Sequence, residues 1–177
     1  KMMAYATDPT KDIHRDMAAK CYKCNPKQVD KKIRYAGKNG FVFPHLYGSY
    51  WKKIAPAMWA MIDEHKMEVD GVPMREHLAS KGIRELGSCG DGFPVPGTFE
   101  HHVKTVEEWF DGEFNVFASS RDAWWDAYRQ RGWFRTMTGF VIRGMFSKNF
   151  LMNADIQGSS FHLLLWSMIE TIRTTRK

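Results

Sequence analysis

The chain has 177 residues and a formal net charge of +6. This basic balance suits a polyanionic partner such as nucleic acid, although many basic proteins bind none. No segment approaches the roughly 20 consecutive apolar residues of a membrane-spanning helix, so we expect no membrane partner. The three cysteines are an odd number, which argues against a secreted disulfide framework and favours a reducing, cytoplasmic compartment.

The first 25 residues contain a polar stretch followed by a helical pattern. Asp12-Ile13-His14 precedes apolar residues at helical spacing over 17–22, and we expect Asp12 to cap this helix. Cys21 and Cys24 have the spacing of half a zinc site, but no second pair follows and Cys89 stands alone. A zinc-binding interaction domain is therefore the weaker hypothesis, and the sequence predicts no metal ligands in this chain.

The next stretch contains two pairs of residues at helical spacing. Arg34 and Lys38 are four residues apart, and so are Phe43 and Tyr47, so each pair shares one face of a helix. Two stacked cations can clamp phosphates, because Arg binds as a fork and Lys as a point charge. A neighbouring aromatic pair suits a ligand with a flat base at its other end. Such pairs are also common on ordinary amphipathic helices, so spacing alone favours an ordinary solvated face for the two cations and ordinary core positions for the two rings.

The residue types are more specific than their spacing. Arg34-x-x-x-Lys38 followed by Phe43-x-x-x-Tyr47-Gly48 resembles the fingers helix of A-family DNA polymerases, the class of bacterial DNA polymerase I and many phage replicases. The resemblance implies that Arg34 and Lys38 contact the phosphates of an incoming dNTP, and that Lys38 protonates the pyrophosphate leaving group. It also implies that Phe43 packs against the sugar and base, that Tyr47 alternates with the template base, and that Gly48 allows close approach there.

The segment around His14 is similar to the same family. Asp-Ile-His ahead of an Ala-rich helix resembles the segment that follows motif A, where the His donates to a triphosphate oxygen. The resemblance therefore makes His14 a third candidate phosphate contact, and its place upstream of Arg34 and Lys38 agrees with the order in the family.

One extra residue distinguishes this chain from the family pattern. Phe43 lies five residues after Lys38 instead of four, and Pro44 follows it where the family has Gly. On a regular helix five residues would turn Phe43 roughly 140° away from Lys38, and Pro44 lacks the N–H for a normal helical bond. We therefore predict one wide turn here, eased by Gly37 and Gly40. A regular helix throughout this stretch would contradict the prediction.

The middle of the chain is less specific. Residues 30–62 read as the motif helix and its continuation, which we expect Pro56 to interrupt. Residues 66–98 are dense in Gly and Pro, and we expect a loop-rich insertion that contains one short helix over 74–81.

Two helices and a hairpin are predicted next. Residues 99–131 follow the helical period twice, and we expect Glu107 and Glu108 to be solvated on the helix exterior. Residues 132–146 switch to the pattern of a short β-hairpin, which resembles the Gly-aromatic-x-x-Thr-x-x-Gly hairpin of the same polymerases.

A second specific signal lies near residue 150. Asn153-x-x-x-Gln157-Gly158 resembles the family's Asn-Ala-Pro-hydrophobic-Gln-Gly element, which implies that Asn153 and Gln157 contact the minor groove of the primer–template. Amide donors can check pairing there without reading sequence, because every correct pair offers acceptors at equivalent places; helix-capping amides are the alternative. The polymerase I group has Arg at the position of Asn149, and Lys148 is the candidate substitute for its charge. A predicted core stripe follows at Phe161, Leu164, Leu165, Met168, Ile169 and Ile172.

These features predict a mainly α chain with a small β-hairpin, of the α+β class. Residues 1–177 would be the fingers and partial palm of a right-hand DNA-directed DNA polymerase of phage type, acting in the host cytoplasm on dNTP and primer–template DNA. Such enzymes use two Mg²⁺ held by two aspartates, and no acidic residue here matches either motif. We therefore expect the metal ligands to lie outside this chain, in the rest of the polymerase, and the chain alone to be inactive. The alternative is a non-catalytic DNA-binding subunit of a split polymerase.

Overall fold

The computed structural model describes residues 2–87 and 92–175, so Cys89 lies outside the described residues. The chain is mainly helical with two small antiparallel sheets, which agrees with the predicted α+β class. It divides into two compact units, Lys1–Asn115 (unit 1) and Val116–Lys177 (unit 2), and each is described by itself. Within the described ranges, no helix has both the length and the apolar character needed to cross a membrane.

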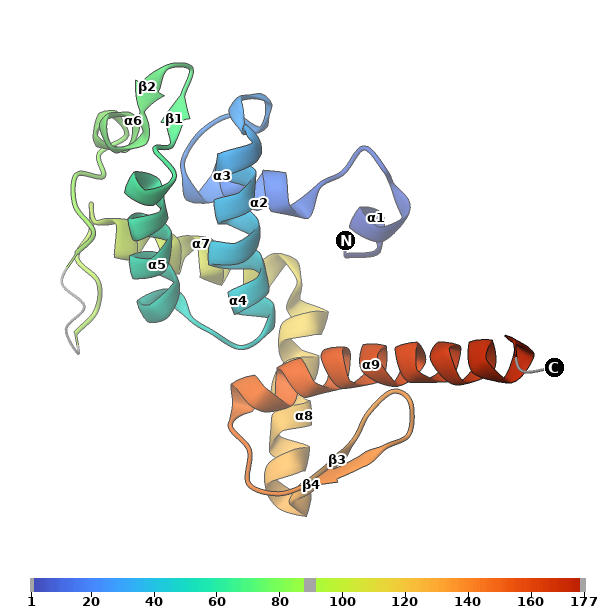
Figure 1. Ribbon diagram of the computed structural model, residues 1–177. Helices are drawn as coiled ribbons and strands as arrows, with labels where there is room; N and C mark the ends of the chain where they lie inside the picture. The colour runs from blue at the N-terminus through green and yellow to red at the C-terminus, as the bar shows by residue number, and fades with distance from the viewer. Residues whose placement is uncertain (1, 88–91, 176–177) are drawn as a thin grey trace. The chain divides into compact units, whose positions relative to one another are not determined.

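Unit 1 begins with short helices (Figure 1), and side-chain caps start those after the first one. The carboxylate of Asp12 accepts hydrogen bonds from the backbone N–H groups of His14 and Arg15, which confirms the predicted cap. Asp30 accepts from the backbone N–H of Ile33 and caps the helix that carries the motif. The elements up to this point are α1 (Met2–Thr7), α2 (Ile13–Cys21), the 3₁₀ turn η1 (Pro26–Gln28) and α3 (Lys31–Ala36).

The motif helix contains the predicted wide turn. Helix α3 continues into the π-helix η2 (Gly37–Val42) and then into α4 (Phe43–Leu46). The backbone N–H of Phe43 donates to the carbonyl of Lys38, five residues back instead of four. The prediction drawn from the extra residue and from Pro44 is therefore confirmed.

The motif helix ends at Leu46, well before Pro56, and Gly48 lies in the cap that follows it. Gly48 has a φ of +86°, and its N–H and that of Ser49 bond to carbonyls of the last turn of α4, which is a Schellman cap. Helix α5 (Trp51–Glu64) then runs through Pro56, so the prediction that this proline interrupts the helix is wrong. Gly48 is required at this position for its backbone conformation, because side chains are strained at positive φ.

The segment after α5 contains a small hairpin that the sequence analysis does not predict. Strands β1 (Glu68–Val69) and β2 (Val72–Pro73) pair in antiparallel fashion around Asp70 and Gly71, both at positive φ, which is the backbone of a tight type I′ turn. The predicted short helix follows as α6 (Met74–Ser80), and α7 (Phe99–Glu113) packs against α5.

Unit 1 has a core of its own between α2, η2, α5 and α7. The Tyr22 hydroxyl donates to the Met58 carbonyl at 3.1 Å, and the Tyr22 ring stacks on Phe99. These contacts join α2 to α5 and α7. The other large side chains buried there include Met17, Ile33, Phe41, Ile54 and Phe110.

Unit 2 contains the predicted second helix and hairpin. Helix α8 (Asn115–Arg131) precedes strands β3 (Trp133–Arg135) and β4 (Val141–Arg143), which pair in antiparallel fashion. The long helix α9 (Lys148–Thr175) follows. Tyr128, Phe134, Leu151 and Met152 form the core, which therefore lies between α8, the hairpin and the first turns of α9.

The second half of α9 does not form the predicted core stripe. His162 stacks on Phe140 of the hairpin, with ring centroids 3.8 Å apart, and the apolar residues around and after it are exposed. The exposed fractions run from 37% to 57% at the six predicted core positions, Phe161, Leu164, Leu165, Met168, Ile169 and Ile172.

Candidate functional site

The π-helix keeps Lys38 beside Phe43 despite the extra residue. The Lys38 ammonium lies 5.0 Å from the centroid of the Phe43 ring, a distance at which a cation is attracted to an aromatic face. Phe43 and Tyr47 also remain neighbours, with ring centroids 6.1 Å apart. The wide turn therefore returns Phe43 to the side of the helix that carries Lys38.

His14 from α2 completes this cluster. Its ring meets Phe43 edge to face, with centroids 5.5 Å apart. Burial lowers the pKa of His14, and the positive charges of Arg34 and Lys38 lower it further, against the opposing effect of Asp12. The imidazole is therefore neutral at pH 7, with one N–H donor. Its Nδ1 is buried and has no hydrogen-bond partner among the described residues.

Arg34 is held in place by Asp12. The carboxylate of Asp12 accepts from Arg34 Nε at 2.6 Å and from Nη2 at 3.3 Å. Burial raises the pKa of Asp12, but the hydrogen bonds from Arg34 and from the start of α2 outweigh it and leave that pKa below its ordinary value. One carboxylate thus fixes both Arg34 and the backbone of His14. The Nη1 edge of Arg34 points away from this pair, and the side chain is 44% exposed.

An open pocket of about 400 Å³ lies along the exposed face of the motif helix. Its lining contains three cations, of which Arg34 is already paired with Asp12, and no other charged residue, so its chemistry suits an anion. His14, Phe43 and Tyr47 do not line it; they lie beside Lys38, farther along the helix. The lining residues are Lys31, Arg34, Tyr35, Lys38 and Asn39.

Two glycines of η2 are required for space. Gly37 has ordinary right-handed helical dihedrals, so it is not needed there for backbone freedom. A Cβ on Gly37 would lie 2.5 Å from the Cβ of Ala18, and a Cβ on Gly40 would lie 2.8 Å from the Cγ of Met58. These glycines let α2 and α5 approach the motif helix closely, which places His14 next to Phe43.

A buried group that the sequence analysis missed joins the motif helix to α7. His45 is 1% exposed, its Nε2 lies 2.8 Å from Asp111, and its Nδ1 lies 3.4 Å from Glu107. Glu107 also accepts from the backbone N–H of Trp51 at 2.9 Å and so caps α5, where Tyr50 offers no side-chain bond. The prediction that Glu107 is a solvated exterior residue is wrong, because its carboxylate is mostly buried, accepts a hydrogen bond at the start of α5 and lies close to a buried imidazole.

The predicted minor-groove contacts lie on α9 of unit 2, whereas Tyr47 and Gly48, the predicted template contacts, follow α4 in unit 1. Asn153 and Gln157 are four residues apart within this helix and therefore share a face. Gln157 is exposed, and the Asn153 side-chain oxygen is buried without a partner among the described residues. Asn149 is exposed, whereas Lys148 donates to Asp122 at 2.6 Å and is already paired.

The described residues contain no group of three or more His, Cys, Asp or Glu side chains that could hold a metal ion. Burial raises the pKa of the Cys21 thiol far above its ordinary value and that of Cys24 to about 11, so neither is a thiolate at pH 7.

Comparison with known proteins gives no family model, no curated protein and no solved structure that matches this chain.

Proposed function

We propose that this chain is the fingers and adjoining palm part of an A-family DNA polymerase, and that unit 1 binds the incoming dNTP. The observation that carries the proposal is the π-helix. The family pattern requires Lys and Phe on one side of the helix, and the extra residue would separate them on a regular helix. The chain instead forms one wide turn in which the Lys38 ammonium lies 5.0 Å from the Phe43 ring.

The cluster offers a base end and a phosphate end. Phe43 and Tyr47 present two rings to a sugar and base, and Lys38 and Arg34 follow toward the start of the helix as phosphate contacts. His14, being neutral, donates an N–H without adding charge. Lys38, whose ammonium is next to the base end, is the proposed proton donor to the pyrophosphate leaving group.

The acidic residues that the structure describes form no site for the two Mg²⁺ ions that such an enzyme uses. Within the described ranges, no three or more His, Cys, Asp or Glu side chains come together as a metal site. Asp12, the carboxylate nearest the proposed phosphate contacts, is already engaged by Arg34 and by the cap of α2. The metal ligands are therefore proposed to come from aspartates of the rest of the polymerase, and the roles assigned here are limited to binding and orienting the nucleotide.

Unit 2 is proposed to grip the primer–template through one face of α9. Gln157 is exposed, so its amide N–H groups are available to the acceptors on the minor-groove edges of base pairs. Asn153 would contribute through its amide N–H, because its oxygen is an acceptor and is buried. Lys148 contributes less than the sequence suggests, because Asp122 neutralises it.

Binding measurements on the Lys38→Ala variant test the proposal. We expect its dNTP affinity, measured by isothermal titration calorimetry, to fall by about tenfold or more, since a hydrogen bond to a charged group contributes about 1.5–3 kcal/mol. Duplex binding in a filter assay should stay nearly unchanged. Lys53→Ala, on the exposed side of α5, is the control. Equal loss of dNTP and duplex binding in Lys38→Ala would contradict the proposal.

A further inference from the structure

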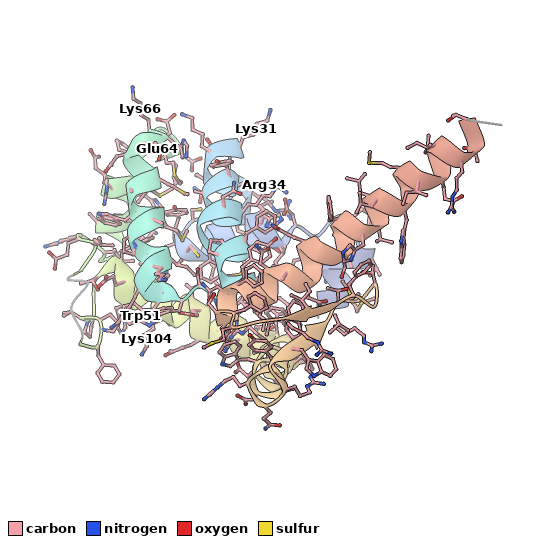
Figure 2. The ribbon with its side chains drawn as sticks, turned by 60° about the horizontal axis from the view of Figure 1, so that its bottom comes forward. Lys31, Arg34, Trp51, Glu64, Lys66 and Lys104 are labelled. Atoms are coloured by element: carbon pink, nitrogen blue, oxygen red, sulfur yellow. The ribbon has the colours of Figure 1, made fainter. Side chains whose placement is uncertain are left out.

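The first residue of the motif helix belongs to the same row of cations. Lys31, Arg34 and Lys38 are spaced by three and four residues, and all three line the pocket on the exposed face. Figure 2 shows Lys31 beyond Arg34 at the start of α3. With 3.6 residues per turn, Lys31 and Lys38 differ in direction by only about 20° and in height by about 10 Å.

A lysine at this position is not explained by local structure. The positive end of the helix dipole disfavours cations in a first turn, and α3 opens with two lysines and no acidic residue there. Lys32 is compensated, because its ammonium donates to the carbonyl of Lys66. Lys31 forms neither a hydrogen bond nor an ion pair with any residue that the structure describes, and Asp30 next to it is occupied as the cap. A local cost without a local gain is typical of a binding residue.

We propose that Lys31 contacts the terminal phosphate of the bound nucleotide and makes the site selective for triphosphates. This inference rests on the proposed function. The aromatic pair fixes the base end, and the cations then follow in the order Lys38, Arg34 and Lys31 toward the start of the helix. A row of phosphates along this face brings the third phosphate nearest to Lys31, while a diphosphate ends at Arg34.

Nucleotide titrations of paired variants test this assignment. Affinities for dATP, dADP and dAMP are measured by calorimetry for the unmodified chain, Lys31→Ala and Lys32→Ala. Because exposed ion pairs are weak, we expect Lys31→Ala to lose about two- to fivefold in dATP affinity, with dADP and dAMP unchanged. Lys32→Ala, a neighbour of equal charge that faces Lys66, should match the unmodified chain. Lys31→Arg should retain the preference for dATP.

A thermal melt separates binding from folding. Removing a cation from the first turn should leave the Tm of Lys31→Ala unchanged or slightly higher, so a lower Tm would assign Lys31 a structural role and overturn the inference. If Lys31→Ala lost equal affinity for dATP and dADP, or if Lys32→Ala lost as much affinity as Lys31→Ala, the effect would come from overall positive charge and not from a contact with the third phosphate. Either result would also overturn the inference. If the unmodified chain binds no nucleotide, the proposed function and this inference both fail. If it binds through Lys38 but Lys31→Ala matches it, only this inference fails.

Discussion

At the scale of single residues, the most informative groups are those whose partners lie far away in the sequence. The sequence predicts that Asp12 caps α2, because a cap depends on neighbouring residues. It does not predict that the same carboxylate binds Arg34, which lies 22 residues later. His45 is a similar case. It stands inside the recognised motif, yet its burial between Asp111 and Glu107 depends on a helix more than 60 residues away. Local patterns cannot predict such pairs.

The His45 contacts predict how the stability of unit 1 depends on pH. Burial lowers the pKa of His45, but the hydrogen bonds and charges of Asp111 and Glu107 outweigh it and raise that pKa above 6.5. A raised pKa means that protonation favours the folded state. The stabilisation is therefore fully present below pH 6.5 and is lost as the pH rises through the raised pKa.

Chemical denaturation of His45→Gln between pH 5.5 and 9 measures this contribution. At the acid end the free energy of unfolding of the variant should be lower by about 1–3 kcal/mol, because Asp111 loses its hydrogen-bond donor and Glu107 loses a neighbouring positive charge. The difference from the unmodified chain should shrink as the pH rises. His14, whose pKa is lowered, is present in both proteins, so its contribution to the pH dependence cancels when their unfolding free energies are subtracted. His101→Gln is the control, and a pH-independent difference would contradict the assignment.

At the scale of elements, the sequence predicts geometry well where one residue dictates the backbone. The extra residue before Phe43, together with Pro44, requires a wide turn, and η2 provides it. Pro56 shows the limit of this reasoning: α5 tolerates it, since a proline removes one helical bond while the rest of the helix stays packed on α7. The exposed stripe of α9 shows a second limit of sequence-based prediction. Periodicity predicts which residues share a face of a helix, but not whether another element covers that face.

Two helical glycines should respond to alanine with opposite signs. In Gly37→Ala the new Cβ would lie 2.8 Å from the Cα and 2.5 Å from the Cβ of Ala18. Such overpacking costs about 1–3 kcal/mol of stability, which should exceed the gain in helix propensity. Because the clash displaces α2, we also expect weaker dNTP binding. In Gly112→Ala nothing lies within 4 Å of the new Cβ, so unfolding should cost up to about 1 kcal/mol more. Urea denaturation measures both, and a stabilised Gly37→Ala would show that α2 and η2 are not in close contact.

At the scale of the whole molecule, the two units have separate cores, a division that the sequence analysis does not predict. The motifs that resemble the polymerase family divide in the same way, with the proposed nucleotide contacts in unit 1 and the proposed minor-groove contacts in unit 2. Motif order along the chain is visible in the sequence, whereas the grouping of apolar residues into two cores depends on contacts between distant helices. A change in one core should therefore affect one of the two proposed activities.

Paired core substitutions test this separation. Met58 and Leu151 are fully buried, in unit 1 and unit 2 respectively, and replacing either with Ala should cost about 2–5 kcal/mol in its own unit. Hydrogen exchange measured peptide by peptide should show faster exchange in residues 2–87 and 92–115 for Met58→Ala, and in residues 116–175 for Leu151→Ala. Because the proposed phosphate contacts belong to unit 1, Leu151→Ala should keep its dNTP affinity while Met58→Ala loses it. Faster exchange in both units of either variant would mean that the chain unfolds as one cooperative body, and the assignment of the two activities to separate units would then be wrong.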